Sequence, residues 1–584
     1  MPVTSEPRAQ LLPNLVLVPQ PPKSVPQTRG PVAILVGVAL FCSIGIAFSF
    51  WLRTVRAGNP DARSGFNMFY VLFARNEPLG LSVVALFSIV SALIILRART
   101  GAAVVATSTK NHARSRFLIP AIAIAVFAVT AAGTEFVSHN YALAADENMA
   151  DFQARIFLRG KIQAELPSQW WPAARAIKPT YADYFLATHS WNSAYYPVYA
   201  AMRAVFQSVH LQSLLNPFFA AMSIFALYST ARKIWPDQKT NALAAVALLA
   251  SSSQFLCMAM TAYAMPAHLA LNTFWLWLYS QPDRRRFYLA PVIGVFALGL
   301  HQPTVHALFA APFLFRLLLQ RRWRAVFIFG AIYAVGCAVC LVWQTHFQSP
   351  ASSNVGALFK LVNPRMAIIQ PMNLLLVIGW ACLATPLLAA LGLRRFSRMP
   401  TILQDAALSG ALTFGFYYFF YLDQAHGWGY RYLHGALVCL ILVAVAGWNV
   451  LAELVGARTA RRFLLAGVAA SLLIQLPLRC FQVEGFVRPF ARAAAALHSS
   501  PTATVAMDAR EAWYSADLIR NDPFLEERPV VVALHKLTPE AIEALQRVGS
   551  VRFIDRATLA SFGLFTNGEV KPYERDPFEL GRGK

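Results

Sequence analysis

Long apolar runs, separated by short polar segments, make up most of the chain. A run of about 20 apolar residues matches the hydrocarbon thickness of a bilayer, so each run predicts a membrane-spanning helix. We expect about thirteen spans, formed by residues 32–52, 81–96, 117–137, 215–230, 242–260, 266–279, 289–300, 305–319, 325–343, 372–393, 402–422, 436–455 and 463–477.

The C-terminal part of the chain has a different pattern. Short apolar runs at 502–507, 530–534 and 551–554 predict buried strands. Between the second and third runs, Thr538 is a suitable N-cap residue and Gly549 a suitable helix terminator, so we expect a helix over 540–548. Alternation of strand and helix indicates a small α/β domain.

These patterns divide the chain into three parts. A Pro-rich, polar stretch without an apolar core begins the chain, and we expect a disordered cytoplasmic tail there. The fold class that follows is a polytopic α-helical membrane protein, interrupted by one long polar and aromatic loop. The predicted parts are residues 1–30 for the tail, 31–480 for the transmembrane domain with its loop at 138–212, and 481–584 for the α/β domain.

Composition and charge distribution narrow the class of protein and its possible partners. Only 14% of residues are charged, whereas soluble globular proteins have about 25%. The formal net charge is +23, but the basic clusters lie at alternate ends of the apolar runs, which is the positive-inside pattern. We therefore expect a cytoplasmic N-terminus, a C-terminus outside, and no nucleic-acid partner. The clusters include Arg232-Lys233, Arg284-Arg285-Arg286, Arg321-Arg322-Arg324, Arg394-Arg395-Arg398 and Arg458-Arg461-Arg462.

Two adjacent carboxylates, Asp146 and Glu147, follow the third apolar run after a short gap. At the membrane edge, such a carboxylate can take a proton from an acceptor hydroxyl, or the two can bind a divalent cation (Mg²⁺ or Mn²⁺). The structural alternative is the start of a helix, where acidic residues interact favourably with the helix dipole. The residues alone leave both open.

A helix beginning at this pair would present a charged stripe, because Glu147, Asp151, Arg155 and Arg159 are spaced four apart. The two arginines are suited to bind a phosphate group. The alternative is a set of salt bridges along the helix, each contributing a few tenths of a kcal/mol.

The sequence HGWGYRYLH, residues 426–434, lies at the outer end of a predicted span. Arg431 could be an interfacial anchor among aromatic rings, or it could bind a phosphate while Trp428 or Tyr430 stacks on a sugar. Alternation of Trp428, Tyr430 and Tyr432 predicts a short extended loop. His301 and Gln302 lie at the turn between two short spans, where buried, hydrogen-bonded polar groups are the favoured interpretation.

The order of these features resembles a known family. An apolar span leads into an outer loop that contains Asp146-Glu147, the string FQARIFLRGKI and the step Tyr196-Pro197. This is similar to the GT-C superfamily of integral-membrane glycosyltransferases, in the family 39-like branch that uses polyprenyl-phosphate sugars. Many relatives have Lys-Tyr-Pro-Pro-Gly where this chain has Tyr195-Tyr196-Pro197-Val198-Tyr199. Either Arg155 or Arg431 would then have to hold the donor phosphate, or the donor differs.

The resemblance implies inverting transfer of a hexose or pentose from a polyprenyl-phosphate donor to a hydroxyl of a cell-envelope glycan, lipid or protein. It places the reaction at the periplasmic face of a bacterial inner membrane and requires no cofactor, with a divalent cation left open. Asp146 matches the catalytic carboxylate and Glu147 its acidic neighbour. The candidate substrate-binding residues are Arg155, Arg159, Tyr196, His301, Gln302, Trp428, Tyr430, Arg431 and Tyr432.

Two other functional classes are compatible with the sequence. A transporter or flippase of lipid-linked sugars would place ionisable groups near the bilayer midplane. Acids inside the predicted spans are scarce, and Asp405, Asp423 and Glu453 lie toward span ends. A non-catalytic assembly protein that presents the C-terminal domain is the third class.

Overall fold

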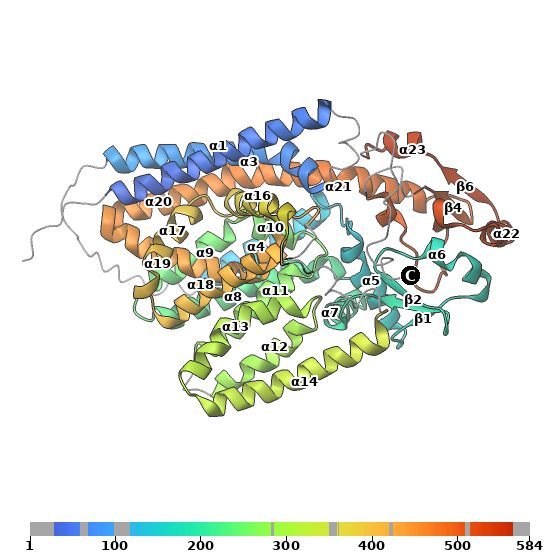
Figure 1. The fold of residues 1–584 in the computed structure, drawn as a ribbon, viewed down its shortest axis with the longest axis horizontal. Coiled ribbons are helices and arrows are strands. Elements are labelled where there is room, and N and C mark those ends of the chain that lie inside the picture. The colour runs from blue at the N-terminus through green and yellow to red at the C-terminus, as the bar shows by residue number, and fades with distance from the viewer. Residues whose placement is uncertain are drawn as a thin grey trace, which may run out of the picture.

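The computed structural model describes residues 28–58, 68–97, 117–281, 285–349, 359, 361–419, 424–508 and 514–564. Long helices run side by side through most of the molecule, and two small sheets lie together at one end (Figure 1). Most of the predicted tail, together with Asp423, lies outside the described residues.

Seven helical stretches in the described residues are long and apolar enough to cross a membrane. This confirms a polytopic helical membrane protein. They comprise α1 (Arg29–Gly58), α3 (Met68–Arg97), α4 (Leu118–Phe136), α8 (Leu215–Ile234), α14 (Trp323–Phe347), α19 (Leu437–Val455) and the continuous stretch of α20 (Ala457–Ala470) and α21 (Leu476–His498).

Two further candidates are helix pairs with a sharp bend. One consists of α9 (Lys239–Ala250) and α10 (Ser253–Ala259), which meet at 59°. The other consists of α16 (Pro364–Trp380) and α17 (Thr385–Arg394), which meet at 115°. Counting each pair as one span gives up to nine candidate spans in the described part of the chain, so the predicted thirteen are not confirmed.

The remaining predicted spans form helices that are too short to qualify. The apolar pattern correctly located these helices but could not distinguish a full-length span from a shorter apolar helix. They are α11 (Met265–Tyr279), α12 (Ala290–Leu298), α13 (Pro303–Leu319) and α18 (Thr401–Phe416).

The last span extends well beyond its predicted end at residue 477. A helical stretch of 42 residues, Ala457–His498, contains a π-helical turn over Ser471–Gln475 and continues as α21. At 1.5 Å per residue it is roughly 60 Å long, about twice the hydrocarbon thickness. α21 therefore carries the chain from the membrane to the C-terminal sheet, as Figure 1 shows.

Residues 138–212 form a compact unit after α4. Its antiparallel sheet has the order β1-β3-β2, and Ala182 pairs with Ser193 across β2 and β3. The elements are α5 (Ala145–Leu158), β1 (Ala164–Glu165), η1 (Ser168–Ala173), α6 (Ala174–Ile177), β2 (Ala182–Phe185), β3 (Ser190–Ser193) and α7 (Pro197–Gln207).

The C-terminal strands and helix lie where the sequence predicted them. Three parallel strands, β4 (Thr504–Met507), β5 (Val530–Ala533) and β6 (Val551–Ile554), have the order β5-β4-β6. They are accompanied by α22 (Pro539–Val548) and α23 (Arg556–Ser561). The Thr538 side chain accepts a hydrogen bond from the amide of Ala541, as expected for an N-cap.

The loop unit and the C-terminal elements share one hydrophobic core. Trp170 and Trp191 from the loop pack in the same cluster as Val532 and Leu545. The indole of Trp191 donates to the carbonyl of Pro523 at 2.7 Å, which fixes the two parts to each other. One end of the helical body is therefore covered by a joint structure, built from segments more than 300 residues apart.

Candidate active site

The predicted acid pair lies in the first turn of α5, but its two carboxylates have different surroundings. The Glu147 side chain is 1% exposed. It accepts backbone hydrogen bonds from Ala144 at 3.3 Å and from Ala262 at 3.0 Å. Burial, with a contribution from Asp146, raises the pKa of Glu147 to about 7. Glu147 thus takes the structural role foreseen for an acid at a helix start, and it fixes α5 to the loop before α11.

Asp146 instead forms an ion pair with Arg431. Its Oδ2 accepts a hydrogen bond from Arg431 Nη1 at 3.0 Å, and the two side chains are 9% and 12% exposed, respectively. Asp146 Oδ1 and Arg431 Nε are both buried and have no hydrogen-bond partner among the described residues. Buried polar atoms are normally paired, so the hydrogen-bonding capacity of these two atoms is left unused by the described residues.

Aromatic rings hold the Arg431 guanidinium on two sides. Its central carbon lies 4.9 Å from the ring centre of Tyr263 and 5.4 Å from that of Tyr432. Its backbone amide donates to Gln424 Oε1 at 2.9 Å, and the Gln254 amide donates to the neighbouring carbonyl of Tyr430 at 2.8 Å. These contacts fix the position of the guanidinium before any ligand binds.

A stacked pair of rings lies near this ion pair. Tyr195 stacks on His301 with ring centres 4.2 Å apart, and Tyr181 lies 5.6 Å from Tyr195. Both nitrogens of His301 are buried without a partner in the described part of the chain. Burial lowers the pKa of His301 to about 4, while Asp146 acts in the opposite direction and Arg431 in the same one. The imidazole is therefore neutral, with one donor and one acceptor unused.

His426 is buried beside Glu147, with its Nε2 3.7 Å from Glu147 Oε1. Its Nε2 lies 2.8 Å from Tyr263 Oη, and its Nδ1 lies 3.1 Å from Tyr514 Oη. Tyr181 and Tyr514 both have left-handed backbone conformations, with φ of 64° and 55°. Such conformations are strained for bulky residues and concentrate at functional sites.

Other predicted contacts around Arg431 are not available to a substrate. Trp428 is 2% exposed and Tyr430 1% exposed, so neither can stack on a sugar from solvent. Trp428 packs against Trp380 and Phe486 instead. The predicted extended loop is also wrong in its second half, because Arg431–Ala436 forms a 3₁₀ helix.

The charged stripe on α5 does not form salt bridges along the helix. Asp151 pairs with Arg203 of α7, Arg155 with Glu527, and Arg159 with Glu526. The predicted alternative is therefore wrong, because it considered only partners within the helix. Arg159 is 56% exposed, whereas Arg155 borders a cavity described below.

Tyr196 and Gln302 occupy the positions just before helices. Tyr196 precedes Pro197 at the start of α7, and Gln302 precedes Pro303 at the start of α13. The backbone amide of Val198 donates to the Gly299 carbonyl at 2.9 Å, which brings the two turns together. This contact brings Tyr195 against His301. The family resemblance did not single out Tyr195 as a neighbour of His301.

The acid pair does not fit a divalent cation. Asp146 is engaged by a guanidinium and Glu147 by backbone amides, so the carboxylates do not converge on one point. Within the described residues, no group of three or more His, Cys, Asp or Glu side chains could hold a metal ion. A cation at this pair would also have to displace Arg431.

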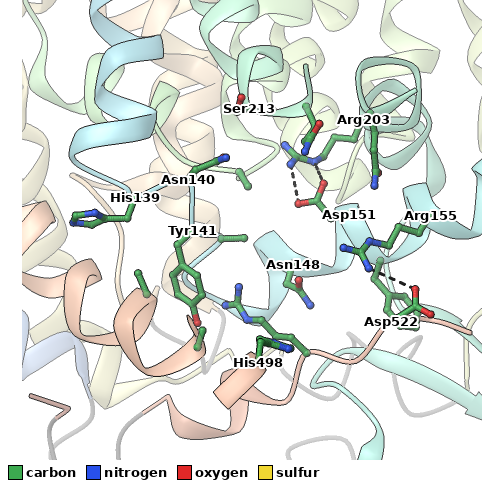
Figure 2. Close-up of a pocket in the computed structure, with 18 of the residues that line it drawn as sticks. His139, Asn140, Tyr141, Asn148, Asp151, Arg155, Arg203, Ser213, His498 and Asp522 are labelled. Carbon is green, nitrogen blue, oxygen red and sulfur yellow. Dashed lines mark hydrogen bonds and ion pairs between the residues drawn. The ribbon is translucent and has the colours of Figure 1, made fainter. Parts of the chain in front are cut away.

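A cavity of about 750 Å³ lies beside α5 (Figure 2). Asn148, Asp151 and Arg155 of α5 line it, and Asp146 does not. The other walls come from the end of α4 and the loop after it, from α7, from the loop before α8, from residues 260–262, from α21 and from residues 520–528. The cavity and the Asp146–Arg431 pair are therefore on different sides of the same helix.

Several residues of the site were not predicted. Tyr181, Tyr195, Tyr263, Gln424 and Arg203 each contact a group at or near the site. Tyr195 precedes Tyr196, which was predicted. An aromatic residue in the long polar loop was the one signal in the sequence that could have pointed to Tyr195. For the other four, no sequence spacing links them to Asp146, since they come from four separate segments.

Comparisons with known proteins give distant structural likenesses. No protein-family model matches the chain, and no curated protein sequence matches it. The structure is similar to ArnT from Cupriavidus metallidurans bound to undecaprenyl phosphate, with 14% identity, a TM-score of 0.47, and coverage of 75% of this chain and 89% of that one. The apo state of the same protein gives 13% identity, a TM-score of 0.46, and coverage of 70% and 84%.

A further similar structure is the oligosaccharyltransferase from Archaeoglobus fulgidus, tethered to an acceptor peptide. It gives 9% identity, a TM-score of 0.41, and coverage of 73% of this chain and 64% of that one. Each of these TM-scores is below 0.5.

Proposed function

We propose that this chain is a GT-C-type glycosyltransferase that transfers a sugar from a polyprenyl-phosphate donor to a hydroxyl of a cell-envelope glycan, lipid or protein. The observation that carries the proposal is the Asp146–Arg431 pair. It combines a carboxylate oxygen and a guanidinium N–H that are both buried and unpaired among the described residues. A proton acceptor beside a phosphate-binding group is what such a transfer requires.

The proposed location is the periplasmic face of a bacterial inner membrane. α8 starts close to the loop unit and ends at Arg232 and Lys233. α20 starts with Arg458, Arg461 and Arg462 and continues through α21 to the C-terminal sheet. The basic ends of both stretches therefore lie away from Asp146, and by the positive-inside rule this supports an outside position for Asp146.

In the proposed reaction, Asp146 Oδ1 accepts the proton of the acceptor hydroxyl. The hydroxyl oxygen forms a bond to the anomeric carbon of the donor sugar, and the bond between that carbon and the phosphate oxygen breaks. The electron pair leaves with the polyprenyl phosphate. Arg431 Nε donates a hydrogen bond to this phosphate as its charge develops. Attack opposite the leaving group inverts the anomeric configuration.

Arg431 thereby connects the two halves of the reaction. Its Nη1 orients the base, and its Nε is free for the leaving group. The rings of Tyr263 and Tyr432 hold the guanidinium in place, so little reorganisation is needed when charge develops on the phosphate.

The test is the Asp146→Asn variant. Loss of the base should lower the rate of glycan transfer by about 10²–10⁴-fold, measured with radiolabelled polyprenyl-phosphate sugar in proteoliposomes. Asp237→Asn is a matched control, since Asp237 is exposed in the turn after α8. Wild-type transfer by the Asp146→Asn variant would remove the proposal.

One observation favours a second candidate, a flippase of lipid-linked sugars. Glu77 of α3 and Arg479 of α21 form a buried ion pair, 2.8 Å between Nη2 and Oε2, beside the sharp bend between α16 and α17. Charged groups at broken helices are typical of transporters. Glu77→Gln should abolish the flux of a lipid-linked sugar in proteoliposomes if the chain is a flippase, and flux without transfer would favour this function.

A further inference from the structure

The cavity beside α5 has no role in the reaction described so far. Its volume of about 750 Å³ falls within the range of small-molecule sites, about 300–1,000 Å³. Thr134, in the last turn of α4, and Gln212, at the start of the α8 span, both line it. Two candidate membrane spans therefore end at this cavity.

The carboxylates that line the cavity are all paired with two of its arginines. Arg203 pairs with Asp151, with Nη2 and Oδ2 2.8 Å apart. Arg155 lies 2.9 Å from Glu527 and 3.5 Å from Asp522. Figure 2 shows the Arg203–Asp151 and Arg155–Asp522 pairs. These two arginines are therefore neutralised by the protein itself.

Two further arginines, Arg520 and Arg528, line the same cavity without a carboxylate partner among the described residues. Four arginines thus face three carboxylates, and the lining has a net positive charge with its histidines neutral. Guanidinium groups with an unpaired charge in a concave site are typical of anion-binding sites.

Arg520 is oriented by groups that do not neutralise its charge. Its guanidinium lies over the ring of Tyr141 at 4.0 Å. Nε donates to the carbonyl oxygen of Asp517 at 2.7 Å, and Nη2 to that of Leu143 at 2.9 Å. Nη1 makes no hydrogen bond in the described part of the chain and is not among the enclosed atoms. It can therefore donate to a ligand without losing an existing contact.

Arg528 is held in a similar way on the exposed wall of the cavity. Its guanidinium lies over the ring of Trp170 at 5.4 Å, and Nη1 donates to the carbonyl oxygen of Leu525 at 3.2 Å. Nε and Nη2 make no hydrogen bond to the described residues. Two oriented guanidinium groups with unused N–H donors therefore border one cavity.

Ligand classes differ in how well they match this lining. A neutral sugar would leave the net charge uncompensated, and a cation would be repelled by it. A carboxylate has two oxygens, which one guanidinium can occupy fully. A phosphate has more oxygens, so it can accept from both arginines and also from the side-chain amide of Asn148, which lines the cavity on α5 (Figure 2).

We propose that this cavity binds a phosphate group, held by Arg520 and Arg528 with Asn148 as a further donor. Two sources can supply the same group: the headgroup of an anionic phospholipid, since two candidate spans end here, or a soluble phosphate ester. The site is separate from the Asp146–Arg431 pair, and binding does not require transfer.

The first part of the test measures a soluble phosphate ester. The full chain in a neutral detergent is titrated with glycerol 3-phosphate by isothermal titration calorimetry, at low ionic strength because salt screens exposed charges. Saturable binding should also raise the unfolding temperature, since the ligand binds the folded state. Glucuronate, which has a carboxylate instead of a phosphate, should bind more weakly.

The second part measures a lipid headgroup. The full chain is released from nanodiscs that contain equal amounts of phosphatidylglycerol and phosphatidylcholine, and native mass spectrometry counts the lipids that stay bound. Phosphatidylcholine has a cation beside its phosphate, so the site should select phosphatidylglycerol. Binding of phosphatidylglycerol alone identifies a headgroup as the ligand, and binding of glycerol 3-phosphate identifies a soluble ester.

Variants locate the binding in the cavity. Arg528→Gln removes an exposed guanidinium that has no ion pair and should weaken binding roughly tenfold or more. Arg520→Lys keeps a charge near Tyr141 but loses the planar fork, so it should weaken binding as well. Arg552→Gln removes the same charge from the exposed face of β6, outside the cavity, and should bind like wild type.

The outcomes separate this proposal from the proposed reaction. Asp146→Asn should abolish transfer yet bind the phosphate ligand like wild type, because Asp146 does not line the cavity. Absence of saturable binding in both parts of the test, equal binding by Arg528→Gln and wild type, or stronger binding of glucuronate than of glycerol 3-phosphate would each overturn the assignment.

Discussion

At the scale of single residues, the site depends on two neighbouring acids that have taken separate roles. Glu147 lies among backbone amides and Asp146 beside a guanidinium. The two acids look equivalent in the sequence, but Glu147 has a structural role, whereas Asp146 keeps a carboxylate oxygen without a partner among the described residues. The difference arises because consecutive residues on a helix point about 100° apart.

Arg431→Lys tests the double role of the guanidinium. Lysine keeps the charge but is a single point donor, so it cannot hold Asp146 and a donor phosphate in one fixed geometry. We expect transfer to fall by roughly 10²-fold, chiefly in kcat, while the variant still folds. The measurement is steady-state transfer in proteoliposomes, with Arg492→Lys on α21 as a control. Unchanged kcat would exclude Arg431 from the leaving-group interaction.

Glu147 makes the stability of the protein depend on pH. Burial raises its pKa from 4.5 to about 7, and burial likewise raises that of Asp517 from 3.8 to about 7. A carboxyl with a raised pKa in the folded state contributes stability that is present below its unfolded pKa and is lost as pH rises to the folded one. The unfolding temperature should therefore fall between about pH 4.5 and about pH 7 and level off above that.

The Glu147→Gln variant isolates the contribution of Glu147 to this pH dependence. Glutamine does not ionise, so the slope of unfolding temperature against pH should become shallower, with the part due to Asp517 remaining. Thermal unfolding in detergent at a series of pH values measures it. A slope as steep as that of wild type would show that Glu147 does not change its protonation on unfolding in this range.

At the scale of elements, the packing of α3 against α21 depends on a glycine. A Cβ at Gly80 would collide with the guanidinium of Arg479, which binds Glu77 and the carbonyl of Gly379. Glycine lets the buried arginine approach the backbone of α3 and reach its partner. The predicted span at 81–96 began too late to include Glu77, so this pair was not foreseen.

Gly80→Ala should displace Arg479 and leave a buried charge without its partner. Breaking such a pair destabilises a protein by about 3–5 kcal/mol, which should appear as a marked drop in unfolding temperature. Gly37→Ala in α1 is the matched control, because no atom lies within 4 Å of the added Cβ. Equal unfolding temperatures for the two variants would show that the guanidinium can move without loss.

At the scale of the whole molecule, the site exists because two distant segments fold together. Asp517 accepts a hydrogen bond from the amide of Ala145 at 3.0 Å, and Asn521 donates to the carbonyl of Ile177 at 2.7 Å. The C-terminal residues thus support the helix that carries Asp146. This support acts on the start of α5, one residue before the proposed base.

Removal of residues 499–584 should therefore expose the loop unit as well. Trp170 and Trp191 would lose part of their shared core, and residues 138–212 should be cleaved by protease at least about tenfold faster than in the full chain. Limited proteolysis followed by mass spectrometry locates the cuts. Full protection of this segment in the truncated chain would show that it folds without the C-terminal elements.

The sequence by itself determined the helical membrane class, the position of most helices and the strands and helix of the C-terminal part. Each of these follows from local periodicity or from a cap such as Thr538. Burial of one face is enough to fix the type of the element. It also identified Asp146 and Arg431 as candidates, through their position at the ends of apolar runs. It could not separate short apolar helices from full-length spans, since both are apolar.

The tertiary structure alone decided which groups meet. Arg431 is 285 residues from Asp146 in the chain, and no spacing rule links them. Asp151, Arg155 and Arg159 pair with residues of other elements for the same reason. An oppositely charged residue from another segment competes with the next turn of the same helix. Periodicity records which side of an element is buried, whereas the identity of the partner depends on how the elements pack.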